Sequence, residues 1–219
     1  MNKMNDINEY LKSTKSAVIK LFEAYYSYWE LMEEPKRPVF TFCGDIDTED
    51  YRLAFNEWEK ENRDILDARI KRDNEFAFEF FSRSTLMGTV LQYAFWGIDK
   101  FSKNETVHED FKDLIKTNSK VKKFCIGRLY EEIPIGLIIY AGRNQAVHFD
   151  DSDLHPVSRR VFEKLTNWYS PTFKKWYRSD YFDLDNSNVL NYAENVTYVL
   201  DWRNYESYET DIKQMLNAI

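Results

Sequence analysis

Residues 133–148 read Ile-Pro-Ile-Gly-Leu-Ile-Ile-Tyr-Ala-Gly-Arg-Asn-Gln-Ala-Val-His. This is the most apolar segment of the chain, and it ends in a group of polar side chains. Pro134 suits the first turn of a helix, because its missing N–H would have no partner there. By pattern alone residues 133–142 could also be a strand. The sequence offers no convincing second strand, so we expect a helix over residues 134–149.

The sequence on either side of this segment also indicates helices. Apolar residues recur at three- and four-residue steps over residues 7–33, and prolines at positions 35 and 38 end that pattern. Thr48 predicts the N-cap of a highly charged helix over about 49–73, and Ser84 predicts the cap of an apolar one over 85–101. The apolar stretch 76–81 is expected to continue the charged helix or to start the next one. Further helical segments are expected at 107–117, 119–130, 156–168, 172–179, 188–200 and 204–217. The fold class predicted is therefore all-α.

Composition supports this prediction. The chain has 219 residues, of which 43% are hydrophobic and 31% charged, as in globular proteins. Six glycines and five prolines are too few for a sandwich or barrel with many tight turns. No apolar run approaches the roughly 20 residues that a membrane helix needs. We expect a single elaborated helical domain over residues 1–219.

Charge and cysteine usage indicate the class of protein and its compartment. The net charge of −7 argues against a protein that coats DNA, although a local basic face could still bind nucleic acid. The polar start, Met1–Asp6, predicts no secretory leader. Cys43 and Cys125 show no paired spacing and are expected to be free thiols. We therefore predict a cytoplasmic protein that makes no membrane contact.

The polar group at the end of the apolar segment carries the chemistry. Arg143 supplies a permanent positive charge whose planar fork matches a phosphate, and His148 can transfer a proton near neutral pH. Asn144 lies four residues before His148 and could orient its imidazole. Arg143 and His148 lie about 140° apart around a straight helix, so their side chains point in different directions. Both could contact one phosphate only in a cleft that spans the two directions, or at an interface with a second helix. Gly142 would permit close approach beside the arginine.

The pattern Arg-Asn-x-x-x-His near the end of an apolar helix resembles the motif of the HEPN superfamily. Arg143, Asn144 and His148 match it position by position, and the resemblance covers roughly residues 84–149. It implies an antiparallel helical bundle with a core at about 84–168 and additional N- and C-terminal helices. It also implies a homodimer whose motif helices face each other.

The activity that the resemblance implies is metal-independent cleavage of cellular RNA, with tRNA as one candidate, by an endoribonuclease that needs no cofactor. The RNA 2′-hydroxyl would attack the adjacent phosphate, with His148 as general acid or base and Arg143 stabilising the phosphorane. The biological role implied is that of a toxin or an antiviral defence protein with an antitoxin or defence partner. Asp150 stands where toxins of this type that are controlled by adenylylation carry a tyrosine, so that form of control is not expected.

Two basic segments are candidates for RNA binding. In the segment 116–128, which ends at Arg128, Lys116, Lys120 and Lys123 would share one helical face. A second group lies among aromatic residues suited to stacking on bases: Lys174, Lys175 and Arg178. The alternative for the first segment is a solvated charged face without RNA. The alternative for the second is that its aromatic residues belong to the core.

Two clusters of possible ligands are candidates for a metal-binding site. Residues 148–155 hold two histidines and three aspartates, His148, Asp150, Asp151, Asp153 and His155, but their spacing fits no standard zinc signature. Residues 183–194 resemble a calcium-binding loop, although Asn188 stands where the turn normally needs glycine. Helix capping explains both clusters, and we expect no metal. The alternative to a nuclease is a non-catalytic helical module that binds protein or RNA.

Overall fold

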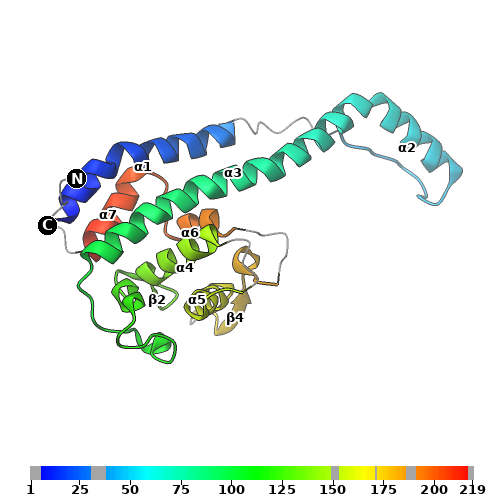
Figure 1. Cartoon of the computed structure of the whole chain (residues 1–219). Helices are drawn as coiled ribbons and strands as arrows, with labels where there is room; N and C mark the ends of the chain where they lie inside the picture. Colours follow the sequence, from blue (N-terminus) through cyan, green and yellow to red (C-terminus); the bar gives the residue numbers. More distant parts are fainter. Residues whose placement is uncertain (1–5, 31–37, 149–152, 171, 186–190, 217–219) are drawn as a thin grey trace. The chain divides into compact units, whose positions relative to one another are not determined.

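The computed structural model describes residues 6–30, 38–148, 153–170, 172–185 and 191–216. The chain is mostly helical, which confirms the broad class expected from the sequence (Figure 1). The α-helices are α1 (Ile7–Glu30), α2 (Glu49–Glu61), α3 (Arg63–Phe101), α4 (Ile135–Val147), α5 (Pro156–Thr166), α6 (Ala193–Val199) and α7 (Tyr205–Met215). Short 3₁₀ helices lie at Glu109–Phe111, Lys120–Phe124 and Asp180–Phe182.

Two small antiparallel hairpins interrupt the helical pattern. Strand β1 (Leu129–Tyr130) pairs with β2 (Ile133–Pro134), and β3 (Asn167–Ser170) pairs with β4 (Lys175–Arg178). The apolar segment therefore begins as a short strand and becomes helical at Ile135. The helix predicted over 172–179 is wrong, because these residues turn back along β3, and Lys174 takes the left-handed backbone conformation with φ of 49°.

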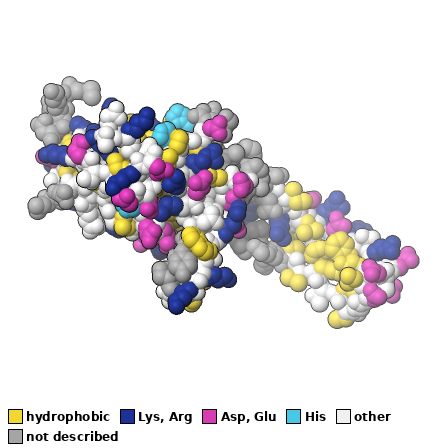
Figure 2. Space-filling model, turned by 90° about the horizontal axis from the view of Figure 1, so that it is seen from below, with side chains coloured by type: hydrophobic (Ala, Val, Ile, Leu, Met, Phe, Trp, Pro, Cys, Tyr) yellow, Lys and Arg dark blue, Asp and Glu magenta, His cyan; other side chains and the backbone are white. Residues whose placement is uncertain are grey.

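The contacts divide the chain into two compact units. The first, Met1–Tyr26 with Arg83–Ile219, is called here the core unit, and it contains the whole of the expected core at 84–168. The second, Ser27–Ser82, is called the acidic unit. The sequence led us to expect one domain. Figure 2 shows hydrophobic side chains of the acidic unit gathered at its surface.

Helix α4 lies at the centre of the core unit. Its residues Ile135–Ile139 are fully buried, which explains the unbroken apolar run. Small residues let its neighbours approach closely: a Cβ on Gly142 would lie 2.9 Å from Val196 of α6 and 3.0 Å from Leu91 of α3. Gly142 therefore permits close approach, as expected, and the groups that approach it are the side chains of neighbouring helices.

Buried tyrosines join the first and last helices of the core unit to α3. The Tyr10 hydroxyl of α1 donates to the Tyr93 carbonyl at 2.8 Å, and the Tyr205 hydroxyl of α7 donates to the Leu11 carbonyl at 3.3 Å. Tyr208 is completely buried between them. Burial raises the pKa of all three hydroxyls above the ordinary value, so they stay protonated at neutral pH.

Helix α3 is longer than expected. Ser84 does not cap a new helix; it is buried in the interior of α3, which runs unbroken over 39 residues. No proline occurs in this range, so nothing in the backbone ends the helix. By contrast, the helices expected at 107–117 and 119–130 shrink to short 3₁₀ segments. Side chains of the preceding loop hold this region: Ser102 donates to the Lys123 carbonyl and Asn104 donates to the Lys122 carbonyl.

Candidate functional site

The polar end of α4 forms the candidate site. Most of the helix before Arg143 is buried, and Arg143 and Asn144 are partly exposed near its C-terminal end. His148 is the C-cap: its N–H donates to the Asn144 carbonyl at 3.0 Å, but its own backbone, at φ −119° and ψ 41°, has left the helical conformation. Its side chain is exposed. The angle of about 140° expected for a straight helix therefore does not fix the direction of the imidazole.

Arg143 is held by three neighbours, Gln92, Phe95 and Asn144, which we call the arginine cradle. Its Nε donates to Gln92 Oε1 at 2.7 Å, and one terminal nitrogen donates to Asn144 Oδ1 at 2.9 Å. Its guanidinium carbon lies 4.5 Å from the centre of the Phe95 ring, within the range of a cation–π contact. Partial burial lowers the pKa of Arg143 somewhat, but a guanidinium keeps its charge in proteins.

Gln92 contributes a second feature to the cradle. While its Oε1 accepts from Arg143, its Nε2 is buried and makes no hydrogen bond within the described part of the chain. A buried donor without an acceptor is costly, and such groups are rare in folded proteins. The cradle thus places an unused N–H donor next to a fixed positive charge.

Tyr140 extends the site by one turn of α4. Its ring packs against Phe95, with centroids 6.1 Å apart, and against Phe124 at 5.2 Å. Burial raises the pKa of the Tyr140 hydroxyl, while a hydrogen bond from the Asn144 side chain and the charge of Arg143 act in the opposite direction. The hydroxyl is therefore a neutral polar group that contacts Asn144.

Gln92, Phe95 and Tyr140 are site residues that the sequence analysis missed. A signal for Gln92 existed, because it is the one polar residue in the run Val90–Phe95. Tyr140 lies four residues before Asn144, the spacing at which helical side chains meet. The pairing of Gln92 with Arg143 joins residues 51 positions apart, and only the packing of α3 against α4 reveals it.

The structure gives His155 a capping role. Its Nδ1 accepts a hydrogen bond from the Val157 N–H at 3.4 Å, at the start of α5, and its ring lies 6.0 Å from that of Tyr140. Asp153 is exposed and 3.7 Å from Arg159. Asp150 and Asp151 lie outside the described residues. Among the residues that are described, no three His, Cys, Asp or Glu side chains gather as metal ligands would.

The calcium-like segment is also used internally where it is described. Asp183 accepts from Arg178 at 2.6 Å, and its other oxygen accepts from the Asp185 N–H. Glu194, the expected last ligand, is nearly buried, accepts from the Tyr25 hydroxyl at 2.8 Å and lies 3.4 Å from Arg83. Glu194 therefore faces the interior of the core unit, and Asn188 lies outside the described residues.

The predicted RNA-binding residues divide into two groups. Arg128 makes a bidentate pair with Asp211, with both bonds 3.0 Å long, and donates to the Leu200 carbonyl; Arg178 pairs with Asp183. Lys123 lies 3.5 Å from Asp99. By contrast, the side chains of Lys116, Lys120, Lys174 and Lys175 are exposed.

The first segment does not form the surface that we expected. Lys116 precedes the 3₁₀ helix that carries Lys120 and Lys123, so the single helical face expected for these lysines is wrong. In the second segment Lys174 and Lys175 lie at the turn of the β3–β4 hairpin, where the Lys175 ammonium is 5.8 Å from the centre of the Tyr177 ring. Its role in RNA binding stays a prediction.

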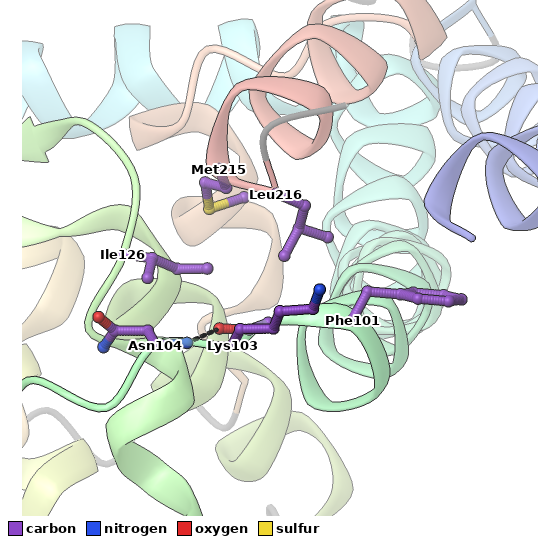
Figure 3. A pocket seen from close by; sticks show the side chains of 7 residues that line it. Phe101, Lys103, Asn104, Ile126, Met215 and Leu216 are labelled. Atoms are coloured by element: carbon purple, nitrogen blue, oxygen red, sulfur yellow. Dashed lines mark hydrogen bonds between the residues drawn. The ribbon is translucent and has the colours of Figure 1, made fainter. Parts of the chain in front are cut away.

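A separate pocket of about 480 Å³ lies at the end of α3 (Figure 3). It is lined by Phe101, Ser102, Lys103, Asn104, Ile126, Met215 and Leu216. None of these is a predicted site residue or a member of the arginine cradle, so this pocket and the candidate site are different places.

Comparisons with known proteins do not assign this chain to a family, so the candidate site is judged from its own residues. Within the described residues no helix is both long and apolar enough to cross a bilayer. The chain matches no family model, no curated protein and no solved structure.

Proposed function

We propose that the core unit is a HEPN-type helical bundle acting as a metal-independent endoribonuclease. Its substrate is cellular RNA, with tRNA as a candidate, and its role is that of a toxin or an antiviral defence protein in the cytoplasm. The observation that carries the proposal is the arginine cradle: a charged guanidinium fixed at the surface end of a buried helix, five residues before an exposed histidine.

Arg143 is suited to an anion that gains charge during a reaction. The Phe95 face and the Gln92 carbonyl hold one side of the guanidinium, so its position is fixed before a ligand arrives. Partial burial lowers the local dielectric constant, which strengthens its attraction for a phosphorane.

His148 is suited to proton transfer because its imidazole reaches solvent. In the proposed reaction a base removes the proton of the 2′-hydroxyl, the oxygen attacks phosphorus, and the 5′ oxygen leaves with a proton from an acid. The products are a 2′,3′-cyclic phosphate and a 5′-hydroxyl. A homodimer with facing motif helices supplies two copies of His148, one for each proton transfer. Asn144 orienting the imidazole remains part of this proposal.

The test is cleavage of total RNA and purified tRNA in EDTA, followed by identification of the product ends. We expect wild-type protein to leave cyclic phosphate ends, and His148→Ala and Arg143→Ala to be inactive. Arg203→Ala is the matched control, because Arg203 is exposed and pairs only locally with Asp201 among the described residues. Equal cleavage by all four proteins would assign the activity to a contaminant or another site.

The second candidate function, a non-catalytic binding module, is favoured by the exposed aromatic side chains of the acidic unit. Absence of cleavage by wild type, together with absence of growth inhibition on expression, would favour this module over the nuclease.

A further inference from the structure

The acidic unit has no hydrophobic core of its own in the part that is described. Every side chain described between Ser27 and Ser82 is exposed or half-exposed, and α2 contains no buried residue. Large apolar side chains are among the most exposed, with Val39 at 78% and Ile46 at 67% of full exposure. Contiguous apolar surface of this kind marks an interaction site in soluble proteins.

Five aromatic rings form one cluster on this unit, which we call the aromatic patch: Phe40, Phe42, Tyr51, Phe55 and Trp58. Phe40 is central, with ring centroids 5.3 Å from Phe55, 5.5 Å from Trp58 and 5.6 Å from Tyr51. Tyr51, Phe55 and Trp58 recur at four- and three-residue steps, so they share one face of α2. The rings therefore pack on one another while staying partly exposed, Phe55 most of all at 37%.

The segment that carries the patch is rich in acidic residues. Residues 38–62 hold seven acidic residues, Asp45, Asp47, Glu49, Asp50, Glu57, Glu59 and Glu61, against the two basic residues Arg52 and Lys60. The whole unit holds 15 Asp and Glu against 8 Lys and Arg, a net charge of −7. That equals the net charge of the complete chain, so the core unit is neutral overall. Figure 2 shows yellow side chains gathered on this unit, with magenta and dark blue side chains beside them.

We propose that the aromatic patch is the docking surface for a partner protein that presents an apolar helix face bordered by Lys and Arg. Apolar contact with the rings provides affinity, and the acidic residues of the segment select a basic partner and speed association. RNA is excluded as the occupant because its phosphates are repelled by these residues. A second copy is disfavoured because two such patches would bring like charges together.

The test uses the full-length chain and fluorescein-labelled peptides of about 18 residues, or five helical turns. The first peptide has an amphipathic Leu/Lys pattern, the second replaces every Leu with Ser, and the third replaces every Lys with Glu. Fluorescence anisotropy gives the Kd. We expect only the Leu/Lys peptide to bind, with a Kd that rises with salt concentration.

Matched variants locate the binding. Phe55→Ser and Glu59→Lys, on or beside the patch, are each expected to raise the Kd of the Leu/Lys peptide about tenfold. Leu53→Ser is the control, because Leu53 is 60% exposed but lies on the opposite side of α2 from Phe55. Circular dichroism confirms that each variant keeps its helix content.

Three results would overturn the proposal. Equal binding of the Ser/Lys peptide would show that charge alone acts. An unchanged Kd in Phe55→Ser would place the site elsewhere. A dimer of the wild type that Phe55→Ser dissociates in sedimentation velocity would assign the patch to a second copy. None of these results depends on ribonuclease activity, so the proposed function is tested separately.

Discussion

The core unit and the acidic unit use the same kind of residue for opposite purposes. In the core unit aromatic side chains such as Phe162 and Tyr208 are fully buried and hold helices together. In the acidic unit Phe55 and its neighbours pack on one another but stay in contact with solvent. Charge follows the same division, since the acidic unit carries the whole net charge. Aromatic content alone therefore does not distinguish a core from a binding surface; burial and local charge do.

The sharpest test of this division concerns catalysis. If activity belongs to the core unit, His148→Ala and Arg143→Ala should each lower kcat/KM by about 10²–10⁴-fold, the range for losing an acid–base or an oxyanion-stabilising group. Phe55→Ser in the acidic unit should leave cleavage unchanged. The assay is initial-rate cleavage of a labelled RNA. A comparable loss in Phe55→Ser would place part of the active site in the acidic unit.

Stability should show the next largest contrast, with the same substitution made in each unit. Phe162→Ala removes a fully buried ring and should lower the free energy of unfolding by about 3–5 kcal/mol. Phe55→Ala removes a ring that is 37% exposed and should cost less than about 1 kcal/mol. Urea denaturation followed by circular dichroism measures both values. Similar losses in the two variants would show that the patch acts as a core.

Within the core unit, Gln92 tests whether the cradle positions Arg143. Gln92→Met keeps the volume but removes the acceptor of the Arg143 Nε–H, and we expect kcat to fall about 10- to 100-fold. KM should change little, because the charge remains. Its unfolding free energy should also stay close to wild type, because the lost bond to Arg143 is offset by removal of a buried donor that has no hydrogen bond in the described residues. A purely structural role for Gln92 would instead lower stability and leave kcat intact.

The smallest expected effect is a loss of stability at alkaline pH. Burial raises the pKa of Tyr208 well above 10, so above about pH 10 the unfolded chain releases this proton while the folded chain keeps it. Its contribution is fully present below pH 10 and declines above it, by up to about 1.4 kcal/mol per pH unit. Urea denaturation between pH 8 and 11 measures the decline. Tyr208→Phe should make this decline less steep, with Tyr10 and Tyr205 still contributing, and an equal slope in the variant would contradict the assignment.

Periodicity predicted the helices whose ends carry local signals. The range 156–168 begins at Pro156 as observed, and the range 204–217 contains α7 with Asn204 as its cap. Periodicity predicted helices wrongly at 119–130 and 172–179, because the backbone conformation of these segments depends on residues that are distant in the sequence. Loop side chains at Ser102 and Asn104 hold the first segment, and pairing with β3 sets the second.

The site could be predicted only in part, for the same reason. Arg143, Asn144 and His148 form a local motif, and the structure does place the first two in one hydrogen-bonded group. The partners of Arg143 on α3, Gln92 and Phe95, depend on how two helices pack, which residue spacing does not encode. Likewise Arg128 looks like a surface cation in the sequence, but Asp211, 83 residues away, engages it.

The arginine cradle also has an entropic consequence. An arginine on an open helix surface samples many rotamers, and fixing it on a ligand costs about 2 kcal/mol of side-chain entropy. In Arg143 the bonds to Gln92 and Asn144 and the contact with Phe95 restrict those rotamers when the chain folds. Binding of an anion to this guanidinium therefore costs less side-chain entropy, because the rotamers of Arg143 are already restricted in the folded chain.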